Sequence, residues 1–577
     1  MTQPDAQVSE GGARPRHPLT VLTLAGSQED MGRQHGELVA ARGGFEPVLD
    51  YYAQMPGRTI GTAELPAPAR GLAHLAFDRL LRRLDARRPA ELRARARAFF
   101  SAVGRPPAES RHMFCMDLLQ NVVGVAGRWG ALPAKRVAQA CAVPSCTSLV
   151  VWGRASAGGT LRHARNFDFP GVGVWEKGPT VVLCRPDQGL RYGFVTTWGA
   201  DVAAVSVWNE AGLVVTPHTR FHRDVRFDGA GIVDLVHAIA RRAGSIEAAW
   251  KVAREHTPIA STWGIAVSSA REGRAVVLET TSAGVELVTP GPDEDYLANA
   301  NRYRSALRAG EVVPSAGFIP NSDGRWLVAR RRAARAQGKG GLDHAALFEL
   351  LGSHEDPEDP SRERALGGVV AQTIAVHSVV VEPEAERTWL SVGPVPTGHG
   401  PWVEVPWAWS DAPSLREVAP PAGHEAPHRF ARGPHAAGYR AFIEAVTRKE
   451  AGEPFARVAE AYEQAAALDP EEPSYRLLAG AARLKQGDVR GGRAHFETGA
   501  MHERSPFHRG QLLFWAARAA AAMDEPGKAD HLRDALLEVA HPALVELKET
   551  SERERGRCYP PRRFRKLVLN PSFPDVT

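Results

Sequence analysis

Residues 144–153 read PSCTSLVVWG, and residues 165–168 read RNFD. The first run predicts a short strand that opens at Cys146, and the second lies on the next predicted strand. This pattern indicates a thiol that is meant to become a chain N-terminus. If the bond between Ser145 and Cys146 is cut, Cys146 gains a free α-amine beside its sulfur, so nucleophile and general base belong to one residue.

A nucleophilic thiol needs a base nearby, and here the α-amine can serve in place of a histidine. The 21 histidines are scattered, and none lies in a signature such as HExxH. A free α-amine titrates near about pH 7.7–8 and a thiol near about 8.5, so the amine can deprotonate its own side chain at neutral pH. The same thiol can attack the carbonyl of Ser145, form a thioester and release the upstream piece on hydrolysis.

Downstream of Cys146 the hydrophobic period changes from helical to alternating. Seven further runs predict strands: TVVLCRP, RYGFVTTWG, VAAVSVW, GLVVTPHT, TWGIAVSS, AVVLET and GVELVTP. A last strand pair, TIAVHSVVVEP and RTWLSVG, closes the region near residue 405, and helical patterns intervene at 229–255, 325–338 and 343–352. Hairpins with grouped helices favour a layered α+β architecture for residues 146–408.

Upstream of the cysteine the chain is mostly helical. Residues 1–18 are polar, contain Gly and Pro, and are expected to be disordered. A short strand is predicted from Leu19 to Ala25, and Ser27 then resembles the first residue of a capping box that starts a helix. The helical pattern continues to about residue 129, so residues 19–145 form a helical pro-segment ahead of Cys146.

Beyond the predicted core, residues 409–435 are rich in Pro, His and Ala and predict a linker. Residues 436–545 are helical, and positions such as Tyr462 and Phe496 recur 34 residues apart, which is typical of tetratricopeptide repeats. Such a domain either binds a protein partner or is a plain helical cap on the core, and both alternatives stay open. The basic end, residues 546–577, is expected to be a solvated tail.

Composition excludes several classes of function. The 577 residues are 44% hydrophobic and 24% charged, and the net charge of +5 is small because acidic residues interleave with the arginines, so nucleic-acid binding is not expected. Five cysteines without a CxxC pair indicate neither a metal site nor a disulfide framework. The chain lacks a secretory signal and any run of about eighteen apolar residues, so we expect a cytoplasmic protein without a membrane partner.

Six stretches, in this order along the chain, resemble the isopenicillin N acyltransferase-like family of self-processing N-terminal nucleophile (Ntn) hydrolases, which is related to choloylglycine hydrolase and acid ceramidase. They are LAGSQEDMGRQHGELV, CTSLVVWG, GGTLRHARNFDFPG, SVWNEAGLVVTPHT, DYLANANRYRS and TIAVHSVVVEPEAERTWLSVG. The resemblance covers roughly residues 20–405. It implies a four-layer αββα sandwich for the core, joined to the helical N-terminal segment and the α-helical repeat domain.

The resemblance also implies roles for individual residues. Cys146 would be the self-cleaving and acylated nucleophile, with cleavage after Ser145. Asp168 would hold the new α-amine, and Arg165 would lie near the thiolate and favour the ionised sulfur. Because Arg165 and Asp168 are three positions apart, their convergence would require a bend in the strand near Asn166 and Phe167. Asn301 would donate a hydrogen bond near the oxyanion or the amine.

The chain departs from the family pattern at three places. The family places a glycine before the nucleophile, where this chain has Ser145. The strand after NEAGL ends in the family in an asparagine of the oxyanion hole, and here His218 and Thr219 are the candidates for that role. Asn299 competes with Asn301 for the assignment above.

Together these features predict an autoproteolytic enzyme that forms an acyl-thioester on Cys146 from a linear amide or thioester, without a cofactor. Water or an amine then takes the acyl group, and the tryptophans near the site suit an apolar acyl chain. One alternative is a cysteine amidohydrolase that works without self-cleavage. Another is a catalytically inactive scaffold that serves the repeat domain as an interaction protein.

Overall fold

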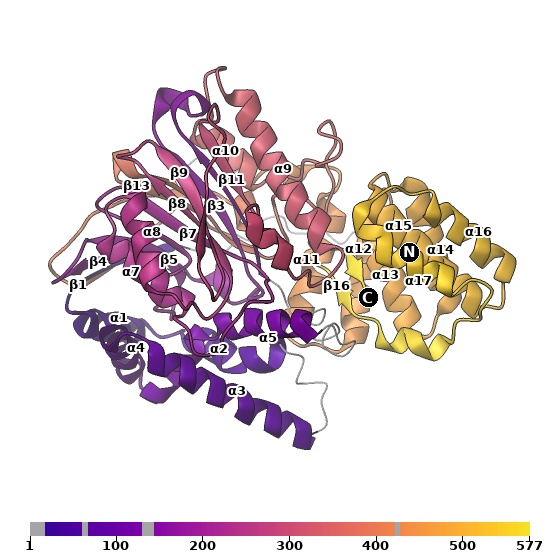
Figure 1. The fold of residues 1–577 in the computed structure, drawn as a ribbon, viewed down its shortest axis with the longest axis horizontal. Helices are drawn as coiled ribbons and strands as arrows, with labels where there is room; N and C mark the ends of the chain where they lie inside the picture. The colour runs from indigo at the N-terminus through magenta and orange to yellow at the C-terminus, as the bar shows by residue number, and fades with distance from the viewer. Residues whose placement is uncertain (1–17, 60–66, 130–143, 422–426) are drawn as a thin grey trace, which may run out of the picture.

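The computed structural model describes residues 18–59, 67–129, 144–421 and 427–577. The predicted disordered tail falls almost entirely outside these residues. Within them the chain is a mixed α+β structure with two large sheets and a helical C-terminal region, as predicted (Figure 1). Among the described residues, no helix combines the length and the apolar character that crossing a bilayer requires.

Two sheets form the centre of the described structure. The larger sheet has the strand order β10-β9-β8-β7-β6-β5-β4-β1-β15, and the smaller sheet has the order β11-β2-β3-β12-β13-β14. The strands of the larger sheet are β1 (Leu19–Gly26), β4 (Pro179–Pro186), β5 (Tyr192–Thr197), β6 (Ser206–Asn209), β7 (Leu213–Thr219), β8 (Trp263–Ser269), β9 (Arg274–Thr280), β10 (Val285–Val288) and β15 (Ser414–Val418). Those of the smaller sheet are β2 (Ser145–Val151), β3 (Arg162–Asp168), β11 (Tyr296–Asn299), β12 (Ala375–Glu382), β13 (Arg387–Ser391) and β14 (Trp402–Pro406).

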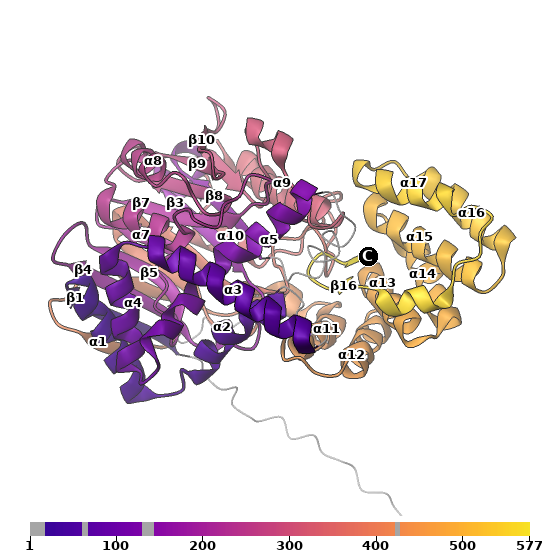
Figure 2. The ribbon, with the colours of Figure 1, turned by 60° about the horizontal axis from the view of Figure 1, so that its bottom comes forward.

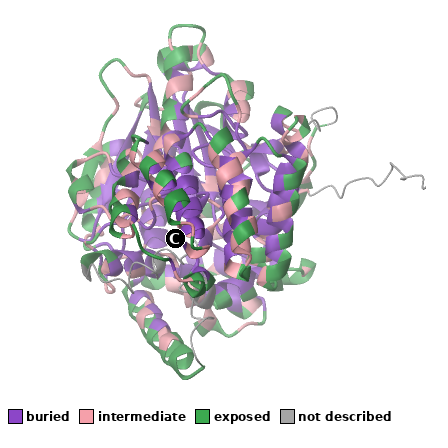
Figure 3. Ribbon diagram, turned by 90° about the vertical axis from the view of Figure 1, so that its right-hand side faces the viewer, coloured by how far each residue is buried: buried purple, intermediate pink, exposed green. Residues whose placement is uncertain are grey.

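The two sheets pack face to face through apolar side chains. Val181 and Val214 of the larger sheet share one buried cluster with Val379 and Val403 of the smaller sheet. Buried residues gather between the layers, and exposed residues lie mainly on the outer helices and loops (Figure 3). Removal of these alternating side chains from water is the main contribution to the stability of such a pair of sheets.

Helices cover the outer faces of both sheets. α7 (Ile232–Arg242) and α8 (Ile246–Glu255) contact β6 to β10 of the larger sheet. α9 (Phe318–Ala336) and α10 (His344–Leu351) contact β2, β3, β11 and β12 of the smaller sheet. The helical patterns predicted at 229–255 and 343–352 are therefore confirmed.

The N-terminal segment is built into the larger sheet. β1 pairs in parallel with β4 and antiparallel with β15, so it is an internal strand. Ser27 Oγ accepts a hydrogen bond from the Asp30 N–H at 3.1 Å, which confirms the predicted helix start. The helices that follow lie below the sheets in Figure 1 and come to the front in Figure 2: α1 (Gln28–Arg42), α2 (Glu46–Thr59), α3 (Ala67–Arg87), α4 (Ala90–Ala102) and α5 (Met116–Trp129).

Close packing of α1 on α4 explains the glycines of the predicted entry helix. A Cβ at Gly32 would lie 2.1 Å from the Arg95 carbonyl oxygen, and one at Gly36 would lie 2.6 Å from that of Phe99. Only glycine lets the two helices approach this closely.

Some predicted elements differ from the structure. The run at 202–208 is a strand only from Ser206 onward, and α9 begins at Phe318 instead of residue 325. β14 was not predicted, and β15 lies within the predicted linker at 409–435. β15 is a short edge strand with mostly exposed side chains, so it lacks the alternating hydrophobic pattern on which strand prediction depends.

The C-terminal region is a stack of antiparallel helices, each in contact with the next along the chain. α12 and α14 begin at Phe455 and Val489, which preserves the 34-residue period found in the sequence. The helices are α11 (Ala436–Glu450), α12 (Phe455–Leu468), α13 (Pro473–Gln486), α14 (Val489–His502), α15 (Pro506–Ala522), α16 (Pro526–Leu537) and α17 (Val545–Arg553).

The prediction of a solvated tail at 546–577 is wrong. After α17 the chain forms a 3₁₀ helix at Pro561–Lys566 and a small hairpin of β16 (Leu569–Asn570) and β17 (Asp575–Val576). Phe573 and Asp575 are buried. The sequence did not predict this packing, because only a few widely spaced residues of this basic segment make the contacts.

Candidate active site

Cys146 is the second residue of β2 and is 2% exposed. In the ladder between β2 and β3, Cys146 lies opposite Phe167, and Ser145 lies opposite Asp168. Side chains of a strand alternate, so Cys146 points toward the larger sheet, whereas Ser145 and Thr147 point to the side of α9.

Arg165 of β3 holds the sulfur of Cys146. Its Nη2 donates to Cys146 Sγ at 3.3 Å and to the Pro217 carbonyl oxygen at 2.7 Å. Within the described part of the chain, no carboxylate forms an ion pair with Arg165. Burial raises the pKa of the Cys146 thiol, and the Arg165 charge acts in the opposite direction. A buried cation without a counter-ion is costly, which indicates a functional role at this position.

The backbone nitrogen of Cys146 has a different partner. Its N–H donates to Asn301 Oδ1 at 2.9 Å. Asn301 Nδ2 donates to the Thr219 carbonyl oxygen at 3.0 Å, and Arg325 Nη2 donates to the same Asn301 Oδ1 at 2.8 Å. Donors on one side and an acceptor on the other fix the orientation of the Asn301 amide. Asn301 therefore lies on the nitrogen that would become the α-amine.

Asn299 does not reach Cys146 within the described contacts. Its Oδ1 accepts a hydrogen bond from Arg220 Nη2 at 2.7 Å. Of the two competing asparagines, the structure therefore brings Asn301 to Cys146.

Arg325 of α9 is a site residue that sequence reasoning missed. It is fully buried, and its Nη1 donates to the Cys146 carbonyl oxygen at 2.5 Å and to Thr147 Oγ1 at 2.9 Å. The sequence around it is rich in arginine, so it does not stand out. One signal was present, because helical spacing places Arg325 on the same face as the buried Val328 and Ala329.

Asp168 lies on the opposite face of β3 from Arg165, beside the Ser145–Cys146 bond. Ser145 Oγ donates to Asp168 Oδ2 at 3.4 Å, and Asp168 Oδ1 has no hydrogen-bond partner among the described residues. Burial raises the pKa of Asp168 to about 7, against the charges of Arg325 and Arg165. The predicted bend is absent, because β3 runs unbroken from Arg162 to Asp168. Arg165 and Asp168 lie on opposite faces of this strand.

The two candidates for the oxyanion hole lie in different places relative to Cys146. His218 Nε2 pairs with Ser148 Oγ at 2.8 Å, between the sheets. Burial lowers the pKa of His218 well below its usual value. Thr219 lines the cavity at Cys146 and contributes its carbonyl oxygen to Asn301. Neither side chain hydrogen-bonds to Cys146 within the described residues.

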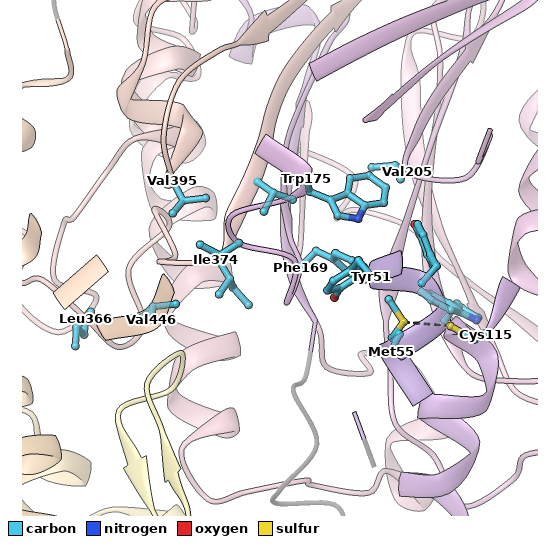
Figure 4. Close-up of a cluster of buried hydrophobic side chains, with 14 of the residues drawn as sticks. Tyr51, Met55, Cys115, Phe169, Trp175, Val205, Leu366, Ile374, Val395 and Val446 are labelled. Carbon is cyan, nitrogen blue, oxygen red and sulfur yellow. Dashed lines mark hydrogen bonds between the residues drawn. The ribbon is translucent and has the colours of Figure 1, made fainter. Parts of the chain in front are cut away.

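An apolar cavity of about 40 Å³ adjoins Cys146. Its lining includes the aromatic residues Phe169 and Trp175, which lie close to each other in Figure 4, and Tyr52, Met113 and Met116 of the N-terminal segment. One water molecule needs roughly 10–15 Å³, so the cavity is small.

No model of a known protein family matches the chain, and no curated protein is significantly similar to it.

Proposed function

We propose that this protein is a self-processing cysteine hydrolase or acyltransferase of the Ntn class, with Cys146 as nucleophile. The observation that carries the proposal is that two atoms of Cys146 have separate partners, Arg165 on the sulfur and Asn301 on the nitrogen. A residue that reacts through its sulfur and uses its α-amine as a base needs a separate partner for each of these two atoms. Two facing sheets with helices on each outer face agree with the αββα sandwich of that class.

Self-cleavage begins with the Cys146 sulfur. The thiol loses its proton and attacks the Ser145 carbonyl carbon, the Ser145–Cys146 C–N bond breaks, and the departing nitrogen takes a proton. Ser145 is then a thioester on Sγ. Water hydrolyses it to a Ser145 carboxylate, which leaves Cys146 with a free thiol and a free α-amine. Arg165 stabilises the thiolate, and Asn301 orients the nitrogen.

Turnover uses the same atoms on a second carbonyl. The α-amine accepts the thiol proton, Sγ attacks the acyl carbon of an amide or thioester, and the leaving amine or thiol receives that proton. Water or an amine then takes the acyl group from sulfur. The cavity wall is mostly apolar, with Arg165 and Thr219 among its polar residues, which favours an aliphatic or aromatic acyl chain.

The test is the mass of the wild-type protein before and after reaction with p-nitrophenyl octanoate. We expect a C-terminal fragment whose first residue is Cys146 and which gains one octanoyl group. An intact chain that still becomes acylated and hydrolyses amides would support a cysteine amidohydrolase without self-cleavage. An intact chain that never becomes acylated would support the inactive scaffold.

The ionisation of Asp168 gives a pH-dependent prediction. Its pKa is about 7 in the fold against 3.8 ordinarily, so its contribution to stability is full below pH 3.8 and is lost as pH rises through 7. If the carboxylate holds the Cys146 nitrogen, self-cleavage should become faster as pH rises through about 7. Asp168→Asn should slow self-cleavage at least about tenfold and abolish this rise.

Asp168→Asn should slow self-cleavage but raise the thermal stability of the fold. In the uncleaved Cys146→Ala background, adding Asp168→Asn should raise the thermal midpoint at pH 8, and the gain should vanish toward pH 4. A purely structural Asp168 would give the contrary result, with stability lost at pH 8. Thermal unfolding of the single and double variants across this pH range measures the difference.

A further inference from the structure

The C-terminal hairpin docks on the first turn of α9. The Gly317 N–H donates to Asp575 Oδ2 at 2.9 Å, and Gln511 of α15 donates to the other oxygen of the same carboxylate. The rings of Phe573 and Phe318 pack edge to face with centroids 5.6 Å apart. The hairpin therefore joins the helical C-terminal region to the start of α9.

Hydrogen bonds through Asn321 and Arg325 link that turn of α9 to Cys146. Asn321 Nδ2 donates to the Ser572 carbonyl oxygen at 3.4 Å and to that of Gly367 at 2.7 Å. Asn321 Oδ1 accepts a hydrogen bond from Arg325 Nε at 3.1 Å. Arg325 in turn binds the Cys146 carbonyl oxygen and Asn301 Oδ1. A continuous chain of hydrogen bonds thus leads from the last residues of the protein to the nucleophile.

We propose that the C-terminal hairpin is part of the active-site scaffold, with Asp575 and Asn321 as positioning residues that act through Arg325. This inference rests on the proposed function. Arg325 forms no carboxylate ion pair in the described part of the chain. Neutral hydrogen-bond acceptors hold its guanidinium, and the charge of Asp168 attracts it from a longer distance. Withdrawal of the hairpin frees the first turn of α9, and Arg325 then loses its fixed position beside Cys146.

A second set of contacts links the helical region to the same surroundings. Arg364 Nη2 donates to Glu503 Oε2 at 3.1 Å, and the Ala365 N–H donates to Glu472 Oε2 at 2.6 Å. This loop continues to Gly367, which binds Asn321. Leu366 and Val446 belong to the same buried cluster as Ile374 and Trp175 (Figure 4). The helical C-terminal region therefore packs against the loop at 364–367, which in turn binds Asn321.

The experiment compares Asp575→Ala with Asp469→Ala in the full-length protein. Asp469 is a matched control, because its buried carboxylate binds His435 at 2.8 Å within the helical region and does not contact α9. We expect Asp575→Ala to lower kcat for p-nitrophenyl octanoate about tenfold or more with little change in KM. The rising limb of its pH profile should move to higher pH, because the Arg325 charge no longer lowers the pKa of Asp168. Asp575→Asn, which keeps an acceptor for Gly317, should restore most of the rate.

The outcomes separate this inference from the proposed function. Equal losses in Asp575→Ala and Asp469→Ala, or a wild-type profile in folded Asp575→Ala, would overturn the positioning role. If Asp575→Ala does not fold, Phe573→Ala gives the same comparison. Alkylation of Cys146 by iodoacetamide across pH needs no turnover, so a shifted alkylation profile in a protein that never becomes acylated supports the hairpin's role while the proposed function fails.

Discussion

Cys146→Ala is expected to leave one uncleaved chain, whereas the wild type is expected to separate under denaturing conditions into residues 1–145 and 146–577. Alanine keeps the strand but removes the sulfur that attacks the Ser145 carbonyl in the proposed reaction. The cleavage rate should fall on the order of 10⁴-fold or more, as when a nucleophile is removed from a protease. Intact mass and N-terminal sequencing of the two proteins measure the effect.

Two controls sharpen this result. Cys558→Ala removes an exposed thiol and should cleave like the wild type. Cys146→Ser keeps a weaker nucleophile and should cleave slowly. Cleavage of Cys146→Ala at the same bond would mean that a contaminating protease makes the cut.

Much of the fold was predictable because its signals are local. The strands of residues 180–290 and the helices at 229–255 follow the hydrophobic period, and the 34-residue spacing of α12 and α14 follows a sequence repeat. The elements that were missed lack such a signal. β15 is an exposed edge strand, and the hairpin at 567–577 docks through single residues such as Asp575.

The candidate site was predictable where its residues are neighbours in β2 and β3. Cys146 and Arg165 are brought together by one antiparallel ladder, so their spacing along the chain contains the information. Arg325 comes from a helix on the far side of the smaller sheet, and only tertiary packing places it at Cys146. His218 was predicted for the site, but alternation along β7 directs its side chain to Ser148, and it does not contact Cys146 within the described residues.

The helical segment ahead of Cys146 should remain bound after cleavage. It supplies β1, an internal strand of the larger sheet, between β4 and β15. Its α4 also provides Arg95, whose Nε and Nη2 each donate to one oxygen of Asp201 at 2.7 Å. His35 Nδ1 lies 3.1 Å from the same carboxylate. The N-terminal segment is thus a structural component, and removing its anchor should lower the stability of the whole protein.

Asp201→Ala is expected to be the most destabilising single change considered. Burial opposes ionisation of Asp201, but the Arg95 charge outweighs it and holds the pKa of the carboxyl well below its usual range. Alanine would leave the buried Arg95 guanidinium without its counter-ion, which typically costs about 3–5 kcal/mol. Urea unfolding in the Cys146→Ala background, where the chain stays whole, measures this loss.

The double variant Arg95→Met/Asp201→Ala should regain much of the lost stability, because it removes the orphaned charge and keeps an apolar side chain of similar length. Glu37→Ala, which breaks the exposed pair with Arg33, should change the midpoint little. In the cleavage-competent protein, Asp201→Ala should release the N-terminal fragment on gel filtration, whereas the wild-type fragments elute together. If Asp201→Ala and Glu37→Ala unfold at the same urea concentration, the buried pair does not anchor the segment, and other contacts such as β1 and the buried Arg88–Asp234 ion pair hold it.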